Sequence, residues 1–284
     1  MTVRRFLLLC ATLAFAALSA RRAHANRDPS ELSVGGGLGA HDAHLSCGPD
    51  VRVKHASAGF TYERTFESPG RPAGEGALFQ LRGGGGTSTI TQVNGAGIAC
   101  GSGSTSTSEC NTEANRLYAN ESGVTHTLAS MQAGGGFDWG RLALAGGLGY
   151  FGLSQAVDQH SHFQSRYLPL PIVDFRVGRR HAGFSANFGA GAAPLPGFTR
   201  WYSMYAIGQY RFREGGEIGA GLIAIPGGEL DARSGVLFKG AVPITDWLSV
   251  GGFGVVDAND RSSLTGFNWT AGGHMTFVLE EIDD

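Results

Sequence analysis

The clearest pattern in the chain is an alternation of apolar and polar positions over residues 267–279. One face of this stretch is apolar, aromatic or small: Phe267, Trp269, Ala271, Gly273, Met275, Phe277 and Leu279. The other face is polar or small: Asn268, Thr270, Gly272, His274 and Thr276. A period of two predicts a β-strand. The stretch is also long enough to cross a membrane, since a tilted strand needs roughly 9–11 residues.

Eleven earlier segments alternate in a similar way, and turn-forming residues separate them. We expect strands at residues 32–40, 51–66, 76–93, 116–137, 140–155, 166–178, 182–192, 199–213, 216–225, 234–242, 246–256 and 267–279. A tight turn is expected at Asp138. Short connections follow the fourth, sixth, eighth and tenth strands, and mostly longer ones follow the odd-numbered strands. The second connection, 67–75, is unusually long for a turn.

Even strand numbers, short periplasmic turns and long outer loops are typical of bacterial transmembrane barrels. The pattern therefore predicts an all-β protein, a closed antiparallel transmembrane β-barrel of about twelve strands. Ten strands is the fallback if 32–40 or 216–225 does not span the membrane. Pro169 and Pro171 lie in an expected strand although proline breaks a β-ladder, so this end forms either a bulge or a segment above the membrane.

Parity assigns the faces of several strands. In 182–192 the outward face holds Ala182, Phe184, Ala186, Phe188, Ala190 and Ala192, and the inward face holds Gly183, Ser185, Asn187, Gly189 and Gly191. In 199–213 we expect Tyr202, Met204, Ala206, Tyr210 and Phe212 outside, with Ser203, Gln209, Arg211 and Arg213 inside. In 234–242 we expect Val236, Phe238 and Val242 outside and Lys239 inside. The strands 216–225 and 246–256 are apolar on both faces and stay undecided.

Composition and the N-terminus agree with export to a membrane. Residues 1–25 combine a charged start, a short apolar run and an Ala-x-Ala end, which predicts a cleaved signal peptide before a single domain, 26–284. No later stretch approaches the eighteen apolar residues of a membrane helix, so a closed barrel is the remaining way to span a bilayer. Glycine makes up 46 of 284 residues, which suits a curved, closed sheet. No basic patch indicates nucleic-acid binding.

The last strand carries a motif that resembles the C-terminal insertion signal of Gram-negative outer-membrane β-barrels. Thr270, Gly272, Met275 and Phe277 supply its polar residue, its glycine and its two alternating apolar residues. The signal usually ends on the aromatic residue, whereas here 278–284 follow. The resemblance implies insertion by the barrel-assembly machinery, lipid of the outer membrane as the surroundings, and a location in the outer membrane after passage through the periplasm.

Charged residues expected on the inward face are the best functional signal. By parity they are Glu63, Arg82, Arg141, Arg166, Asp174, Arg176, Arg211 and Lys239. Such residues set ion preference in a channel, or they plug a narrow lumen as arginine–carboxylate pairs. Two functions stand: a small passive, porin-like pore or solute channel, and a structural or surface-interaction barrel with a plugged lumen and an unknown surface partner. The cationic excess of this set predicts a weak anion preference if the barrel conducts.

Other chemistry is less favoured. Asp158, His160 and His162 share a loop, but their spacing is loose, so a solvated loop is expected rather than a metal site. An outer-membrane hydrolase is the weakest alternative because no nucleophile motif accompanies His274. We therefore expect no enzyme and no cofactor. Cys100 and Cys110 are predicted to form a disulfide in one outer loop, with Cys47 as the rival partner.

Overall fold

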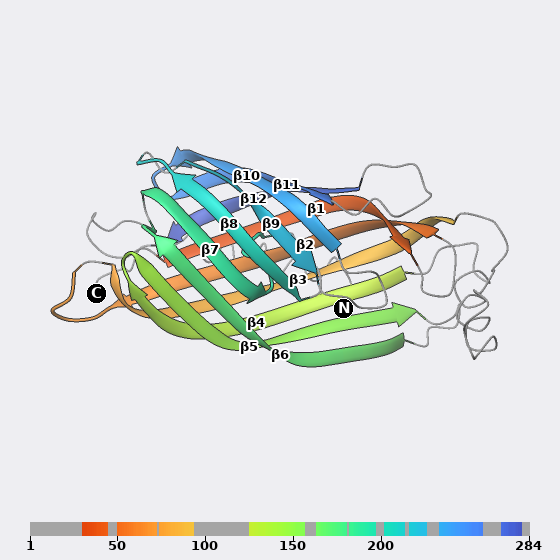
Figure 1. Ribbon diagram of the computed structural model, residues 1–284, viewed down its shortest axis with the longest axis horizontal. Helices are drawn as coiled ribbons and strands as arrows, with labels where there is room; N and C mark the ends of the chain where they lie inside the picture. The colour runs from red at the N-terminus through yellow and green to blue at the C-terminus, as the bar shows by residue number, and fades with distance from the viewer. Residues whose placement is uncertain are drawn as a thin grey trace.

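The computed structural model is a closed antiparallel barrel whose strands follow one another around the wall in chain order (Figure 1). It describes residues 30–44, 50–72, 74–93, 125–156, 163–180, 182–196, 202–213, 216–225, 233–257 and 268–279. The first and last strands pair from Ser30–Leu279 to Ala40–Trp269, which closes the sheet. The prediction of an all-β closed antiparallel barrel is confirmed.

The described part of the chain contains twelve strands, so the fallback of ten is not needed. Their bounds agree with the alternating segments to within a few residues at most ends. They are β1 (Ser30–His44), β2 (Asp50–Glu67), β3 (Glu75–Val93), β4 (Thr125–Trp139), β5 (Leu142–Ala156), β6 (Phe163–Gly178), β7 (Gly183–Gly191), β8 (Ser203–Arg211), β9 (Glu217–Ile225), β10 (Arg233–Thr245), β11 (Leu248–Asp257) and β12 (Trp269–Leu279).

The barrel wall has two heights. Strands β2 and β3 contain 18 and 19 residues, whereas β7, β8 and β9 contain 9 each. At about 3.3 Å per residue, nine residues give roughly the length that a tilted strand needs to span a bilayer. The strands β1–β6 therefore continue beyond the short strands at the end of the barrel that carries the long loops (Figure 1). We call β1–β6 the long wall and β7–β9 the short wall.

Side chains alternate between the lumen and the outer surface as parity predicts. On β7, Phe184 is 66% exposed while the neighbouring Ser185 is 1% exposed. On β8 and β10, Met204, Tyr210, Phe238 and Val242 are exposed outside. The two undecided strands are now assigned: Ile218 and Leu222 of β9 and Val250 of β11 are exposed, whereas Ile223, Phe253 and Val255 are buried inside.

Three local predictions are wrong. Arg213 was expected on the inward face, but β8 ends at Arg211 and the Arg213 side chain is exposed. The turn after β4 was expected at Asp138, but β4 continues to Trp139 and the chain reverses at Gly140, whose φ is 75°. Asp138 is instead buried, and its Oδ1 accepts the Gly140 N–H at 2.8 Å. Ala192 was expected on the outward face, but β7 ends at Gly191 and the backbone of Ala192 bonds to side chains inside the lumen.

The long second connection is a compact turn. Ser68 N donates to Glu75 O at 3.0 Å, and Arg71 N donates to Ser68 O at 3.1 Å. Glu75 N donates to Pro72 O at 3.1 Å. These bonds satisfy backbone groups that the ladder between β2 and β3 no longer pairs, so a turn of this length remains ordered at the end of the barrel with the short connections.

The upper part of β6 has one uncovered edge among the described residues. Its ladder with β5 runs from Phe163 to Val177 without a register shift, past Pro169 and Pro171. Its ladder with β7 begins only at Val173. The prolines therefore do not form a bulge against β5, and they lie above the level where the short wall ends.

The outer surface is apolar and carries an aromatic belt near the short turns. Exposed rings in this belt include Phe66, Trp139, Tyr210, Phe212 and Trp247. Aromatic side chains of this kind mark the level of the membrane–water interface. In the described residues, no helix is long and apolar enough to cross a membrane.

Candidate functional site

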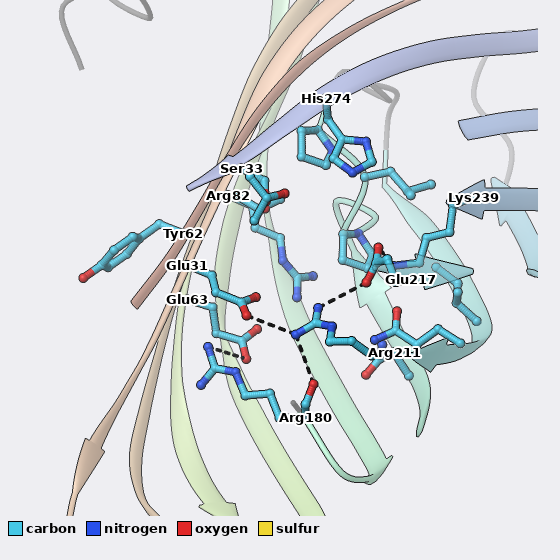
Figure 2. Close-up of a pocket in the computed structure, with 18 of the residues that line it drawn as sticks. Glu31, Ser33, Tyr62, Glu63, Arg82, Arg180, Arg211, Glu217, Lys239 and His274 are labelled. Atoms are coloured by element: carbon cyan, nitrogen blue, oxygen red, sulfur yellow. Dashed lines mark hydrogen bonds and ion pairs between the residues drawn. The ribbon is translucent and has the colours of Figure 1, made fainter. Parts of the chain in front are cut away.

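The inner wall near the short turns is lined by charged side chains from both sides of the barrel (Figure 2). They come from strands that are distant in sequence, because alternation points one residue in two inward and closure brings opposite strands together. The lumen is narrow enough at this level for side chains from facing strands to touch. We call this set the ion-pair layer, and it consists of Glu31, Glu63, Arg82, Asp138, Asp174, Arg176, Arg180, Arg211, Glu217 and Lys239.

Arg211 of β8 is the centre of one group of pairs. Its Nη1 lies 3.0 Å from Glu31 Oε1 on β1, and its Nη2 lies 3.2 Å from Glu217 Oε2 on β9. Nη1 also donates to the Arg180 carbonyl at 3.0 Å. The second oxygen of Glu217 accepts from Lys239 Nζ at 3.0 Å. This group connects β1 to strands on the opposite side of the lumen, as Figure 2 shows for Arg211 and Glu31.

Arg176 of β6 is the centre of a second group. It pairs with the buried Asp138 of β4, and its Nη1 lies 3.5 Å from Glu63 Oε1. Arg180 Nη2 lies at the same distance, 3.5 Å, from that carboxylate oxygen. Gln80 Nε2 donates to the other oxygen of Glu63 at 3.1 Å. Charge-assisted bonds of this kind are stronger than neutral ones, so the second group joins β2, β3, β4 and β6.

Arg82 of β3 links the ion-pair layer to the level above it. Only 5% of its side chain is exposed, and it pairs with Asp174 of β6. Its Nη1 donates to Tyr205 Oη at 2.9 Å and to the Ala192 carbonyl at 3.2 Å. One guanidinium therefore contacts the long wall, the short wall and the chain that leaves β7.

After β7 the chain leaves the wall and enters the lumen. We call residues 192–196 the inward segment. Gln132 Oε1 accepts the Ala192 N–H at 2.7 Å, and Ser203 Oγ donates to the Gly191 carbonyl at 2.8 Å. Leu195 is 3% exposed. It belongs to a buried apolar cluster that also contains Ala193, Tyr205, Ile207, Ile223, Leu237, Phe253 and Val255.

Two small cavities remain between the inward segment and the ion-pair layer. Their volumes are about 120 and 60 Å³. The larger is lined by charged residues of both groups, by His274 and by Pro194, Leu195 and Pro196 of the inward segment. Both volumes are smaller than the ligand pockets of roughly 300–1,000 Å³ that proteins use for drug-sized molecules.

The structure places six of the eight inward candidates in the lumen: Glu63, Arg82, Asp174, Arg176, Arg211 and Lys239. Arg141 is not among them. Its side chain is exposed in the turn before β5 begins at Leu142, where strand parity no longer fixes direction. Arg166 lies in β6, but its side chain is outside the described part of the structure.

Four charged members of the ion-pair layer were missed from the sequence. Glu31 precedes the expected start of the first strand, and Asp138 and Arg180 were assigned to turns. Glu217 lies on a strand that is apolar on both faces. An isolated carboxylate in such a strand is the one signal that could have identified Glu217, because burying an unpaired charge is costly.

The missed residues change the charge balance. Among the described residues, the layer holds five cations, Arg82, Arg176, Arg180, Arg211 and Lys239, against five carboxylates, Glu31, Glu63, Asp138, Asp174 and Glu217. The predicted anion preference rested on a cationic excess, which this layer does not have.

The other candidate residues are placed as follows. Thr270 is buried inside, where its Oγ1 lies 3.0 Å from His55 Nε2. Met275 is exposed outside, and the Phe277 ring stacks on Trp247 at 6.3 Å. Gly272 leaves room for the Phe253 ring, because a Cβ at Gly272 would lie 2.6 Å from it.

Several predictions fall on residues outside the described ranges. They concern the signal peptide at 1–25, the disulfide between Cys100 and Cys110, the rival Cys47, and the loop with Asp158, His160 and His162. The described residues contain no group of three or more histidine, cysteine, aspartate or glutamate side chains that could hold a metal ion.

A closed antiparallel wall with an apolar, aromatic outer surface and a charged lumen defines the chain as an outer-membrane β-barrel of Gram-negative type. No protein-family model matches the sequence, and a search of curated proteins finds no match either.

Several solved structures resemble the fold at low sequence identity. The transport unit of the autotransporter AIDA-I from Escherichia coli is 10% identical, covers 96% of this chain and 97% of its own, and gives a TM-score of 0.46. The β domain of the Bordetella autotransporter BrkA is 7% identical, with coverages of 88% and 99% and a TM-score of 0.45. OprB from Pseudomonas putida at low pH is 13% identical, with coverages of 88% and 91% and a TM-score of 0.31. We therefore infer function from the geometry of this barrel itself.

Proposed function

We propose that this protein is a barrel with a closed lumen, which serves as a membrane-anchored structural or surface-interaction platform rather than as an open passive pore. The observation that carries the proposal is the inward segment. It lies inside the barrel, and its Leu195 side chain is packed in an apolar cluster with residues of β8, β9, β10 and β11.

The ion-pair layer supports the same proposal. An ion that passed this level would have to compete with pairs that already satisfy each charge, such as Arg211 between Glu31 and Glu217. Pairs between facing strands also hold the two sides of the lumen together. The cavities between the layer and the inward segment, about 120 and 60 Å³, have room for only a few water molecules.

The long wall supports a role at the surface. A strand of about 9–11 residues spans a bilayer, yet β2 and β3 contain 18 and 19 residues. Their excess length extends the sheet beyond the short wall at the end with the long loops. A partner at the surface would meet this raised edge first.

A small gated pore is the second candidate, and one observation favours it. Among the described residues, the inward segment is hydrogen-bonded to the wall through Ala192, whose N–H donates to Gln132 and whose carbonyl accepts from Arg82. Net contributions of single hydrogen bonds are about 0.5–1.5 kcal/mol, and somewhat more when one partner is charged. Displacement of this short segment would break these bonds and the apolar contacts of Leu195, and it would widen the lumen.

Conductance in planar lipid bilayers separates the two functions. The closed-lumen proposal predicts that the refolded protein gives no steady current. A variant that combines a Gly-Ser link in place of residues 193–196 with Arg211→Gln should conduct, because the inward segment and the pairs that connect β8 to β1 across the lumen are then both removed. Heat-dependent gel migration of both proteins verifies that the barrels are folded. A steady current through the unaltered protein would contradict the proposal and favour the passive pore.

We also propose that the protein is not an enzyme. Hydrolysis by a serine would need a base in contact with the hydroxyl. In the described lumen, Ser33 Oγ lies 2.7 Å from Thr276 Oγ1, and Ser203 Oγ donates to a carbonyl. Turnover of ester or phospholipid substrates by the refolded barrel, abolished by substitution of a lumen serine, would contradict this proposal.

A further inference from the structure

One histidine of the lumen is buried with a ring nitrogen that makes no hydrogen bond. His274 of β12 is 8% exposed, and its Nδ1 has no hydrogen-bond partner among the described residues. Buried polar atoms nearly always have such a partner. Histidine is also the side chain that ordinarily gains and loses its charge near neutral pH, so the acidity of the surroundings decides whether this imidazole is charged.

His274 lies directly beside the inward segment. Strand pairing places it between Gly35 of β1 and Gly251 of β11, and both glycines leave space around it. A Cβ at Gly251 would lie 2.6 Å from Nε2 of the imidazole. A Cβ at Gly35 would lie 2.9 Å from the His274 Cβ and 2.6 Å from the Pro196 carbonyl oxygen. The histidine and the inward segment therefore border the same small space, and both line the larger cavity.

The charged groups near His274 are those of the ion-pair layer. At its own level, the adjoining strands present Gly35 and Gly251, and the inward segment has no titratable side chain. The charged residues that line the larger cavity with His274 are Glu31, Glu63, Arg82, Arg176, Arg180, Arg211, Glu217 and Lys239 (Figure 2). Tyr62, the other titratable residue of this lining, points away from the cavity in Figure 2.

Each carboxylate of this lining is already in an ion pair. Glu217 uses one oxygen for Arg211 and the other for Lys239. Glu31 and Glu63 are paired as well. A proton on the imidazole therefore adds a positive charge to a layer in which cations and carboxylates are equal in number. Burying a charge without a partner is costly, and water that enters the cavity relieves this cost.

We propose that His274 makes the closure of the lumen acid-sensitive, because protonation of its imidazole displaces the inward segment. This inference rests on the proposed function, since it treats residues 192–196 as the part that closes the lumen above the ion-pair layer. At neutral pH the uncharged imidazole leaves the segment packed on the cluster that contains Leu195. In acid the imidazole is charged, the segment gives up its bonds through Ala192, and water takes its place.

Hydrogen–deuterium exchange of the folded full chain in detergent tests the inference at about pH 7.5 and about pH 5.5, on either side of the ordinary histidine pKa. The readout is the exchange rate of the Ala192, Ala193 and Leu195 amides. The unaltered barrel is compared with His274→Gln at the same pH, because pH itself changes the intrinsic rate. At the lower pH the unaltered barrel should exchange these amides about tenfold faster, since an imidazole in water is then protonated about ten times more often than not. At the higher pH the two rates should be equal.

His41→Gln is the matched control, because His41 is another buried histidine of the lumen but does not line the larger cavity. It should respond to acid as the unaltered barrel does. Equal exchange by the unaltered barrel and His274→Gln at the lower pH would overturn the proposal, as would loss of the response in His41→Gln. Faster exchange in the β8 ladder as well would also overturn it, because the whole barrel would then be loosened.

Folding of each variant is verified by heat-dependent gel migration, and His274→Asn provides a second uncharged replacement. The exchange measurement does not depend on conductance. A steady current at neutral pH would refute the closed lumen, whereas the exchange rates decide the role of His274, so the two failures are told apart.

Discussion

The inner faces of the long wall and of the strands opposite it differ in the size of their side chains. Next to the ion-pair layer, one row of the inner face of β1–β3 consists of glycine, with Gly35, Gly59 and Gly84 on successive strands. Across the lumen, β8–β11 contribute large buried side chains, among them Tyr205, Leu237 and Phe253. The inward segment packs on the large residues and comes close to the small ones.

This difference shows how the lumen of a narrow barrel can be filled by a segment of the chain. A Cβ on Gly35 would lie 2.6 Å from the Pro196 carbonyl oxygen, so the segment occupies space that the small residue leaves. Facing walls that were both lined with large side chains would have no room for it, because protein interiors are already close-packed. One wall supplies the apolar contacts, and the other supplies the space.

The largest expected effect comes from the residue that connects both sides. Arg82→Met removes the partner of Asp174 and the bonds to Tyr205 and Ala192. Breaking a buried ion pair by removing one member typically costs about 3–5 kcal/mol. We expect a loss of this size in the free energy of unfolding, measured by urea titration of the barrel in lipid vesicles. The exposed Arg213→Gln serves as control, and an equal loss there would contradict a special role for Arg82.

The apolar side should be the next most sensitive. Leu237 is fully buried in the cluster that holds the inward segment. Leu237→Ala is expected to cost about 3 kcal/mol, since large-to-small changes in a core lose both burial and packing. The same urea titration measures the loss. Leu222→Ala, at an exposed position on the outer face of the neighbouring β9, should cost less in the same titration. Similar losses would show that the cluster is not packed as described.

The outer and inner faces of the short wall provide a third test. Ala186→Arg on β7 should impair membrane folding by about 2–4 kcal/mol, because that face meets lipid. Asn187→Arg points into the lumen, where Asn187 lines the larger cavity, and should be better tolerated. Folding yield into vesicles, read from gel migration, measures both. Equal effects at the two positions would show that the faces are assigned wrongly.

The smallest expected effect comes from filling the space beside Gly35. Gly35→Ala places a methyl group 2.6 Å from two carbonyl oxygens and should cost about 1–3 kcal/mol through overpacking. Gly254→Ala is the control, because a Cβ there meets nothing within 4 Å. Thermal unfolding of the two variants compares them. If Gly35→Ala is as stable as Gly254→Ala, the inward segment does not rely on this space.

The architecture could be predicted from the sequence because strands alternate with a period of two. One face of each strand must be apolar because it contacts lipid. Phe184 and Phe188 therefore identify the outer face of β7 from the sequence alone. Twelve strands and their order follow from the same pattern and from the lengths of the connections. Alternation does not predict the direction of Ala192, because it applies only within a strand and β7 ends at Gly191.

The partners inside the lumen could not be predicted in the same way. Parity tells which charges face inward, but the pairing of Glu31 with Arg211 depends on closure of the barrel, since these residues lie 180 positions apart in the chain. The entry of residues 192–196 has only an indirect signal. Pro194 and Pro196 prevent a continued strand after Gly191, and Leu195 is a large apolar residue between them.

Among the described residues, the upper edge of β6 is not paired with β7, and this has a consequence for many copies in a crowded membrane. An exposed strand edge is a template on which a second chain can add a strand, and this is a common start of aggregation. Pro169 and Pro171 have no N–H groups to offer such a chain, while the Tyr202 hydroxyl already donates to the Pro171 carbonyl at 2.8 Å. The two prolines therefore disfavour strand addition by a neighbouring barrel at the place where the wall changes from long to short strands.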